Sequence, residues 1–202
     1  MVVILIHPRR LATMLDNAVL FAKEGKGNGR GVIVETTPSE LLVTGVGQHG
    51  IVTDTEPHND HWLDSRVLLP AGDATELAKV VRGVPDAGKQ GTEVAVTVIM
   101  TQEYGEVLRV AQGAEIIAEL ATDERLTPVL DVLATARRVK TSTDEGDVYT
   151  VSILALIGRL KPLGERERAV LHHKTVGDTT RFTFGTCTGF IEGNRTPVGA
   201  LL

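Results

Sequence analysis

The chain has 202 residues, a net charge of −5 at pH 7 and an apolar fraction of 42%. A chain of this length buries a core without a disulfide or metal, and its single cysteine, Cys187, cannot form an internal disulfide. Its apolar runs fall short of the roughly 20 residues of a membrane span, and the N-terminal charges follow the first run. We therefore expect a cytoplasmic protein with no membrane contact.

The first predicted elements are a strand over residues 2–6 and a helix from Pro8 to about Lys23, since proline is favoured at the first helical position. Apolar residues recur at helical spacing along one side of this helix. The opposite side carries polar residues, which are Arg9, Arg10, Thr13, Asp16 and Asn17. The glycine-rich segment 24–31 ends the helix, because glycine is costly within helices.

From residue 30 the period changes to two, which predicts three antiparallel strands over residues 31–36, 41–46 and 50–55. A short strand over residues 67–69 follows, and Asp73 is the expected N-cap of a helix over residues 74–84. The apolar arc of that helix contains Leu77, Ala78, Val80, Val81 and Val84, while Lys79 and Arg82 face outward. Three more strands are predicted over residues 93–98, 105–112 and 114–122.

The first 120 residues thus read as one β-α-βββ motif used twice, and they are predicted to form one domain. Residues 121–147 are interpreted as a connector, which begins either as a linker or as a short helix that starts at Thr127 and Pro128. Residues 148–202 repeat the motif as a half-domain or reduced second domain, with a strand over 148–152, a helix over 153–164 and three strands over 169–176, 179–185 and 188–194. The predicted class is α+β, with helices on one side of antiparallel sheets.

Three such units with basic residues on their helices resemble the DNA sliding clamps, and most closely the bacterial type, the beta subunit of DNA polymerase III. The resemblance is carried by PRRLATMLDNAVLFA, SELLVTGVGQHGIVTDT, RVLLPAGDATELAKVVRGVPD and AEIIAELATDERLTP within residues 1–130, and by TTRFTFGTCTGFIEGNRTP near the carboxyl end. Bacterial clamps have three full domains, whereas this chain has room for about one and a half, or for two if the connector contains a reduced repeat. The resemblance therefore implies a shortened form without the middle domain.

The resemblance implies a replication processivity factor that holds duplex DNA through phosphates, without reading sequence, and tethers a polymerase. Lysines and arginines on helices suit this role, and an aromatic content of 3% argues against a single-strand stacking surface. Each candidate also has an ordinary interpretation as part of a solvated helix face. The candidate DNA contacts are Arg9, Arg10, Lys23, Lys26, Arg30, Lys79, Arg82, Arg159 and Lys161.

Closure around DNA would need a homo-oligomer joined head to tail by edge strands. With about twelve helices as the family template, four helices per chain imply a trimer and three imply a tetramer. A second hypothesis is a truncated clamp mimic that binds replication proteins or a full-length clamp without encircling DNA.

Other motifs do not support an enzyme. The segment Gly45–Gly50 has the letters of a dinucleotide fingerprint, but a strand follows it instead of a helix. The segment Gly83–Gln90 nearly spells a phosphate loop, but it follows a helix and precedes a strand. A metal-dependent enzyme built around His58 and His61 remains a third alternative, although a polar surface loop is the simpler interpretation. We expect no catalytic residue, metal or cofactor.

Overall fold

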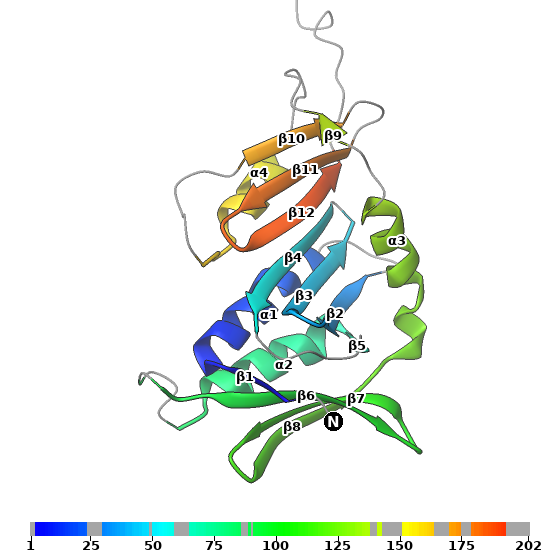
Figure 1. The fold of residues 1–202 in the computed structure, drawn as a ribbon. Coiled ribbons are helices and arrows are strands. Elements are labelled where there is room, and N and C mark those ends of the chain that lie inside the picture. The colour runs from blue at the N-terminus through cyan, green and yellow to red at the C-terminus, as the bar shows by residue number, and fades with distance from the viewer. Residues whose placement is uncertain are drawn as a thin grey trace, which may run out of the picture.

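The computed structural model describes residues 3–23, 30–48, 50–58, 65–85, 89, 91–137, 141–142, 151–163, 170–174 and 179–192. Two β-α-βββ units occupy the first 121 residues (Figure 1). The first consists of β1 (Ile4–Ile6), α1 (Pro8–Ala22), β2 (Gly31–Thr36), β3 (Glu40–Gly47) and β4 (Gly50–Pro57). The second consists of β5 (Ser65–Leu69), α2 (Ala71–Arg82), β6 (Val94–Thr101), β7 (Gly105–Gln112) and β8 (Glu115–Ala121).

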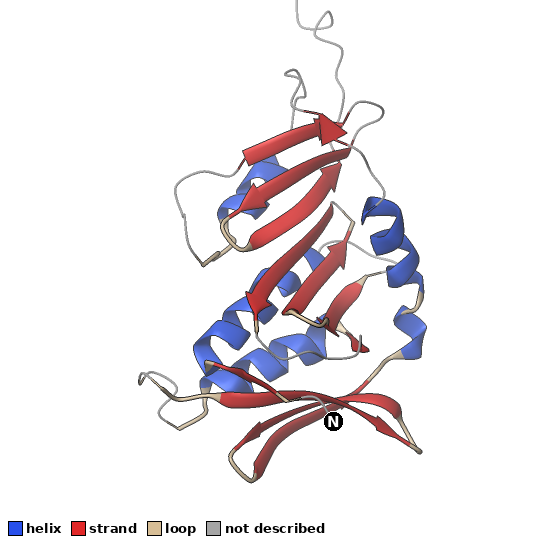
Figure 2. Cartoon of the chain, in the orientation of Figure 1, coloured by secondary structure: helices blue, strands red, loops and turns tan. Residues whose placement is uncertain are grey.

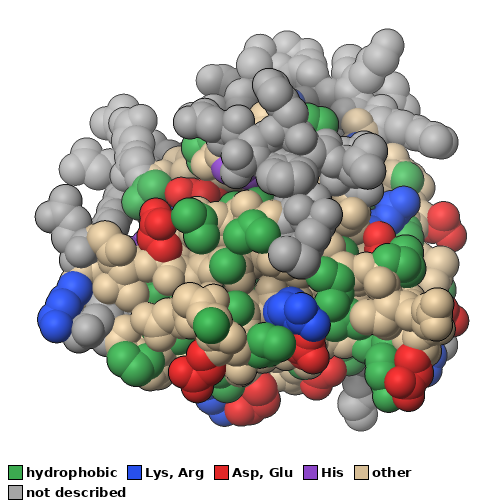
Figure 3. Space-filling model, turned by 60° about the horizontal axis from the view of Figure 1, so that its bottom comes forward, with side chains coloured by type: hydrophobic (Ala, Val, Ile, Leu, Met, Phe, Trp, Pro, Cys, Tyr) green, Lys and Arg blue, Asp and Glu red, His purple; other side chains and the backbone are tan. Residues whose placement is uncertain are grey.

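The strands form two antiparallel sheets that exchange one strand between the units. The first sheet has the order β1-β6-β7-β8, so the first strand of unit one pairs with unit two. The second sheet begins β5-β2-β3-β4, so the first strand of unit two pairs with unit one. This exchange ties the two units into one body. The outer face of the first sheet carries hydrophobic and acidic side chains with few basic ones (Figure 3).

Helices α1 and α2 pack against each other and against one face of both sheets (Figure 2). Their buried sides meet the inward side chains of β1 to β3 and of β5 to β8 in one core that includes Leu15, Val43, Leu77 and Val96. Helix α1 approaches β3 closely at Gly45, where an added Cβ would overlap the carbonyl oxygen of Ala18. Glycine is therefore required at this position of the strand.

The remaining strands that the structure describes extend the second sheet, and three helices accompany them. They are the 3-10 helix η1 (Glu124–Leu126), α3 (Pro128–Arg137), β9 (Thr141–Ser142), α4 (Val151–Gly158), β10 (Val170–Lys174), β11 (Thr179–Phe184) and β12 (Cys187–Glu192). Strand β12 pairs antiparallel with β4, with Gly50 opposite Ile191 and Asp54 opposite Cys187. The sheet therefore runs without a break from β5 to β9 through eight strands. Helix α3 packs on its outer side through Val129 and Leu133.

The predicted α+β class is confirmed, with α1, α2 and α4 on one side of the antiparallel sheets, whereas α3 packs on the opposite face of the second sheet. Several local predictions are wrong. Helix α2 begins at Ala71 after Pro70, so Asp73 lies in its first turn and is not its N-cap. Val80 is 45% exposed and not part of the buried arc.

In the third unit, Val151 and Ser152 start α4 and do not continue a strand, and the helix ends at Gly158 instead of residue 164. The first strand of this unit is β9, within the segment interpreted as a connector. Residues 148–150 of the predicted strand lie outside the described residues. The division into domains at residues 120 and 148 stays a prediction.

Candidate nucleic-acid interface

Three predicted DNA contacts from opposite ends of the chain meet beside α1. Lys23 follows the C-terminal end of α1, and Arg159 and Lys161 follow the end of α4. All three side chains are exposed, and together they line a cavity of about 500 Å³ between the two segments. Asp16 also lines this cavity. Water and counterions screen like charges at such a surface, and a polyanion would replace those counterions.

Arg9 extends this positive surface toward the start of α1. Its exposed side chain and Lys161 line a neighbouring hollow of about 490 Å³, whose wall includes Gly158 and Pro162. Arg9, Lys23, Arg159 and Lys161 are called the α1 basic surface below. They come from two units that β4 and β12 join, so the sheet pairing places these four cations together.

The cations of α2 are exposed but already paired. Lys79 Nζ lies 2.6 Å from Glu76 Oε1, and its side chain is 61% exposed. Arg82, 44% exposed, forms an ion pair with Asp16 of α1 and so links the two helices. Exposed pairs of this kind contribute little stability, so both cations can exchange a carboxylate for a phosphate at small cost.

Arg10 does not face outward as predicted. Its Nη1 and Nη2 donate to the two carboxylate oxygens of Asp54 at 2.9 and 2.7 Å, and its Nε donates to Glu56 at 2.7 Å. The side chains of Arg10 and Asp54 are 9% and 0% exposed. Burial opposes the charge of Arg10, but the hydrogen bonds to Asp54 and Glu56 outweigh it and raise the pKa of the guanidinium. Arg10 is therefore a structural cation and not a DNA contact.

Asp54 also accepts a hydrogen bond from Asn17. The helical pattern predicted Asn17 on the solvent-facing side of α1. Asn17 Nδ2 donates to Asp54 Oδ2 at 2.7 Å and to the Lys161 carbonyl at 3.2 Å, while its Oδ1 accepts from the Lys161 amide at 2.8 Å. Arg10 Nη2 reaches the Thr186 hydroxyl at 3.3 Å. These contacts, called the junction cluster below, hold the segment that carries Arg159 and Lys161 against α1.

Cys187 lies in the same cluster and is fully buried. Burial, reinforced by the charge of Asp54, raises the pKa of its thiol well above the ordinary value. The thiol thus stays protonated at neutral pH, which is the opposite of what a nucleophile or metal ligand requires.

Of the two remaining candidates, Arg30 does not line the α1 basic surface. Arg30 precedes β2 and donates from Nη2 to Gln48 Oε1 at 3.3 Å, beside the turn between β3 and β4. Lys26 lies outside the described residues, as does His61. Among the described residues no group of His, Cys, Asp and Glu could hold a metal.

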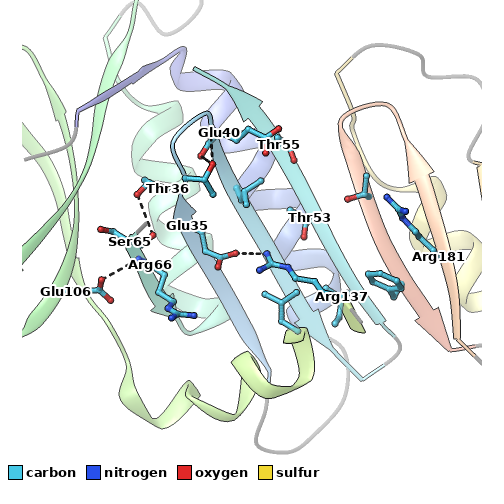
Figure 4. Close-up of a pocket in the computed structure, with 16 residues that line it drawn as sticks. Glu35, Thr36, Glu40, Thr53, Thr55, Ser65, Arg66, Glu106, Arg137 and Arg181 are labelled. Atoms are coloured by element: carbon cyan, nitrogen blue, oxygen red, sulfur yellow. Dashed lines mark hydrogen bonds and ion pairs between the residues drawn. The ribbon is translucent and has the colours of Figure 1, made fainter. Parts of the chain in front are cut away.

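The second sheet also has a hollow of about 770 Å³ on the face where α3 lies (Figure 4), and this hollow is called the outer groove below. Arg137 of α3 reaches across this outer groove to Glu35, with Nη2 and Oε2 2.8 Å apart. Arg181 lies on the far side of the groove, and Thr53 and Thr55 of β4 form part of its floor. Phe190 also lines the groove. The groove is open, polar and separated from the α1 basic surface by the thickness of the sheet.

No protein-family model matches the sequence, and no curated protein is significantly similar to it. Solved structures are similar in fold. A DNA polymerase III beta subunit from Borrelia burgdorferi has a TM-score of 0.64 at 10% identity over 96% of this chain and 65% of its own. The beta sliding clamp of C. crescentus has a TM-score of 0.63 at 12% identity, over 94% and 64%. The beta subunit from Pseudomonas aeruginosa has a TM-score of 0.58 at 12% identity, over 96% and 67%.

This chain has the sliding-clamp fold. It spans about two thirds of the length of these bacterial clamps, in agreement with the predicted shortened form. In this clamp fold, the letters of the dinucleotide fingerprint fall on the β3–β4 hairpin, and the described part of the near-phosphate loop lies between α2 and β6. Neither opens a helix. None of the helices that the structure describes has the length and hydropathy needed to cross a bilayer.

Sequence reasoning missed the junction cluster of this clamp fold, although one signal was present. Strand residues alternate between faces, so Asp54 shares a face with the buried Val52. A carboxylate on the apolar face of a strand needs a buried partner, and α1 supplies both Arg10 and Asn17.

Proposed function

We propose that this protein is a non-enzymatic, sliding-clamp-like processivity factor that grips or encircles duplex DNA through phosphate contacts and tethers a polymerase. The observation that carries the proposal is the meeting of Lys23, Arg159 and Lys161 at one exposed surface of a clamp fold. Arg9 extends this surface, and Lys79 and Arg82 would add contacts from α2.

The chemistry of this surface suits movement along DNA. Flexible cationic side chains bind phosphates at any register and carry no base information. The overall charge of −5 would keep other parts of the surface from binding the polyanion. Retention would then come from surrounding the duplex, which requires more than one copy of the chain.

Tethering a polymerase requires a surface that stays open while the helices face DNA. The outer groove meets this condition because it lies on the other side of the sheet from α1. Its lining combines three arginines, three glutamates and several threonines, which suits a polar peptide of mixed charge. Arg181→Glu should weaken capture of a cognate polymerase without changing DNA affinity, while a loss of DNA affinity alone would remove the groove from this role.

The test of DNA binding is the triple variant Lys23→Glu, Arg159→Glu and Lys161→Glu. Its affinity for a labelled duplex should fall at least about tenfold, and the slope of log K against log salt should fall by about 0.9 per lost phosphate contact. Arg125→Glu is the control, since Arg125 is 87% exposed on η1 and pairs locally with Asp123. Equal affinities for the triple variant and the control would contradict the proposal.

The alternative is a clamp mimic that binds replication proteins or a full-length clamp without encircling DNA. The two functions differ on nicked circular DNA. A clamp is retained on the circle and lost on linearisation, whereas a mimic is not retained on either.

A further inference from the structure

The two sheets end in four edge strands, and three of them are protected. Strand β1 has three residues and β9 has two, which is too short to template a partner. Strand β5 is covered, because the Thr122 hydroxyl accepts from the Leu68 amide and the Asp123 amide donates to the Leu68 carbonyl. Strand β8 has seven residues and no strand on its outer side among the described residues.

Strand β8 has two structural equivalents, and these pair with each other. Each unit ends in a strand that follows a two-residue hairpin turn, namely β4, β8 and β12. Strands β4 and β12 pair antiparallel, with the first residue of each opposite the fifth residue of the other. Among the three units that the structure describes, only the last strand of the second unit, β8, therefore has no strand on its outer side.

The backbone of β8 is suited to the same pairing. The Thr122 amide donates to the Glu106 carbonyl. Hydrogen-bonded and non-hydrogen-bonded pairs alternate along an antiparallel ladder, so the amides and carbonyls of Glu119 and Ala121 point away from β7. They are available to a further strand.

The side chains of β8 protect this edge only through Glu115 and Glu119. The strand contains no lysine, arginine or proline, and Ile116 is 50% exposed. Leu5 and Ile116 lie in one row across the outer face of the sheet, through Ala95 and Ala111. This apolar row reaches the open edge at Ile116, where the sheet of a second copy would continue it.

We propose that β8 pairs antiparallel with β8 of a second copy, about a two-fold axis close to Ala118. The register is that of the pairing of β4 with β12, in which the third residue of one strand lies opposite the third residue of the other. Ala118 is the third regular position of β8, because Ile117 is an extra residue at a bulge. The contact is isologous, in contrast to the predicted head-to-tail joint, and it does not depend on DNA binding.

Charge sets the response of this contact to salt. Each β8 carries Glu115 and Glu119, and Arg109 compensates only Glu119, at 2.5 Å. Two copies therefore bring uncompensated carboxylates to one short interface. Salt screens this repulsion, so the dimer should become tighter from 50 to 500 mM salt, whereas a contact held by ion pairs would weaken.

The first test is sedimentation equilibrium of the full chain over a wide concentration range. A monomer–dimer equilibrium is expected, and Ala121→Pro should raise the dimer dissociation constant at least about tenfold, because proline removes an outward amide without affecting the pairing with β7. Ala121→Ser, which keeps the amide, is the control. Ile116→Lys provides a second disruptive variant if the proline variant fails to fold.

The second test distinguishes the symmetry. In a Cys187→Ser background, Ala118→Cys should form a disulfide-linked dimer on mild oxidation, because non-hydrogen-bonded cross-strand positions are close enough for a disulfide. Ala95→Cys, in the middle of the same sheet, should not. A heterologous contact gives no cross-link at residue 118. That result, or a monomer at all concentrations, would overturn the proposal.

Discussion

Arg10 on α1 and Asp54 on β4 are joined by two hydrogen bonds of 2.7 and 2.9 Å, and water reaches little of either side chain. A buried pair is not an efficient source of stability, but the loss of one member leaves the other charge uncompensated. The pair also positions the third unit. Arg10 contacts Thr186, and Asp54 contacts Asn17, which binds the backbone of Lys161.

Arg10→Ala should therefore lower the free energy of unfolding by about 3 kcal/mol, because it leaves Asp54 buried without its cation. Urea unfolding measures this change. Lys79→Ala is the matched control, and its exposed ion pair should contribute less than about 0.5 kcal/mol. If Arg10→Ala retained full stability but lost DNA binding, the sequence prediction of a DNA contact would be restored.

Removing the carboxylates that pair with the α2 cations should strengthen DNA binding. Asp16→Asn frees Arg82, and Glu76→Gln frees Lys79. The double variant should bind duplex DNA several-fold more tightly at low salt, and the gain should disappear at high salt. Its stability should change little, because both pairs are exposed. The converse variant, Lys79→Glu with Arg82→Glu, should weaken retention on DNA.

Cys187 should make the fold sensitive to alkaline pH. The raised pKa means that the folded state keeps the thiol proton above pH 9.0, the ordinary value, where the unfolded chain releases it. The folded state then binds more protons, so stability falls as pH rises, by at most about 1.4 kcal/mol per pH unit. Chemical unfolding between pH 8 and 11 measures this slope. Cys187→Ala should remove it, and a thiol reagent that labelled the folded protein rapidly at pH 8 would contradict the assignment.

Gly45→Ala should separate α1 from β3. The added Cβ would overlap the Ala18 carbonyl, and backbone atoms on both sides cannot give way without moving the helix. A loss of about 3 kcal/mol or more is expected in thermal or urea unfolding. Gly72→Ala in α2 provides the comparison, since nothing lies near its added Cβ and the substitution should be neutral or slightly stabilising.

Periodicity was sufficient to predict the two units of the first 121 residues. Helix α1 begins at Pro8 as predicted, and β2 over Gly31–Thr36 has the predicted bounds, because local pattern and tertiary packing agree there. The third unit was harder to predict. Its first strand, β9, has two residues, and a hydrophobic period cannot be detected over that length.

Side-chain roles depended on contacts between distant segments, which periodicity does not contain. Arg10 and Asn17 lie on the polar side of α1, and they are buried because β12 and Lys161 cover that side. The same contact brings Lys161 to Lys23, a proximity that no local pattern predicts. Lys79 and Arg82 face outward as predicted, but Glu76 and Asp16 already hold them.

The pairing of β4 with β12 also bears on the polarity of any ring that this chain builds. The three described units leave one last strand, β8, unpaired in each chain. Pairing β8 with β8 of another copy turns that protomer over relative to the first. Because this contact closes on two copies, a ring would need a second self-matching contact, and it would then have dihedral symmetry and two identical faces. It could be loaded onto DNA in either direction, and it would present the outer groove toward polymerases approaching from both sides.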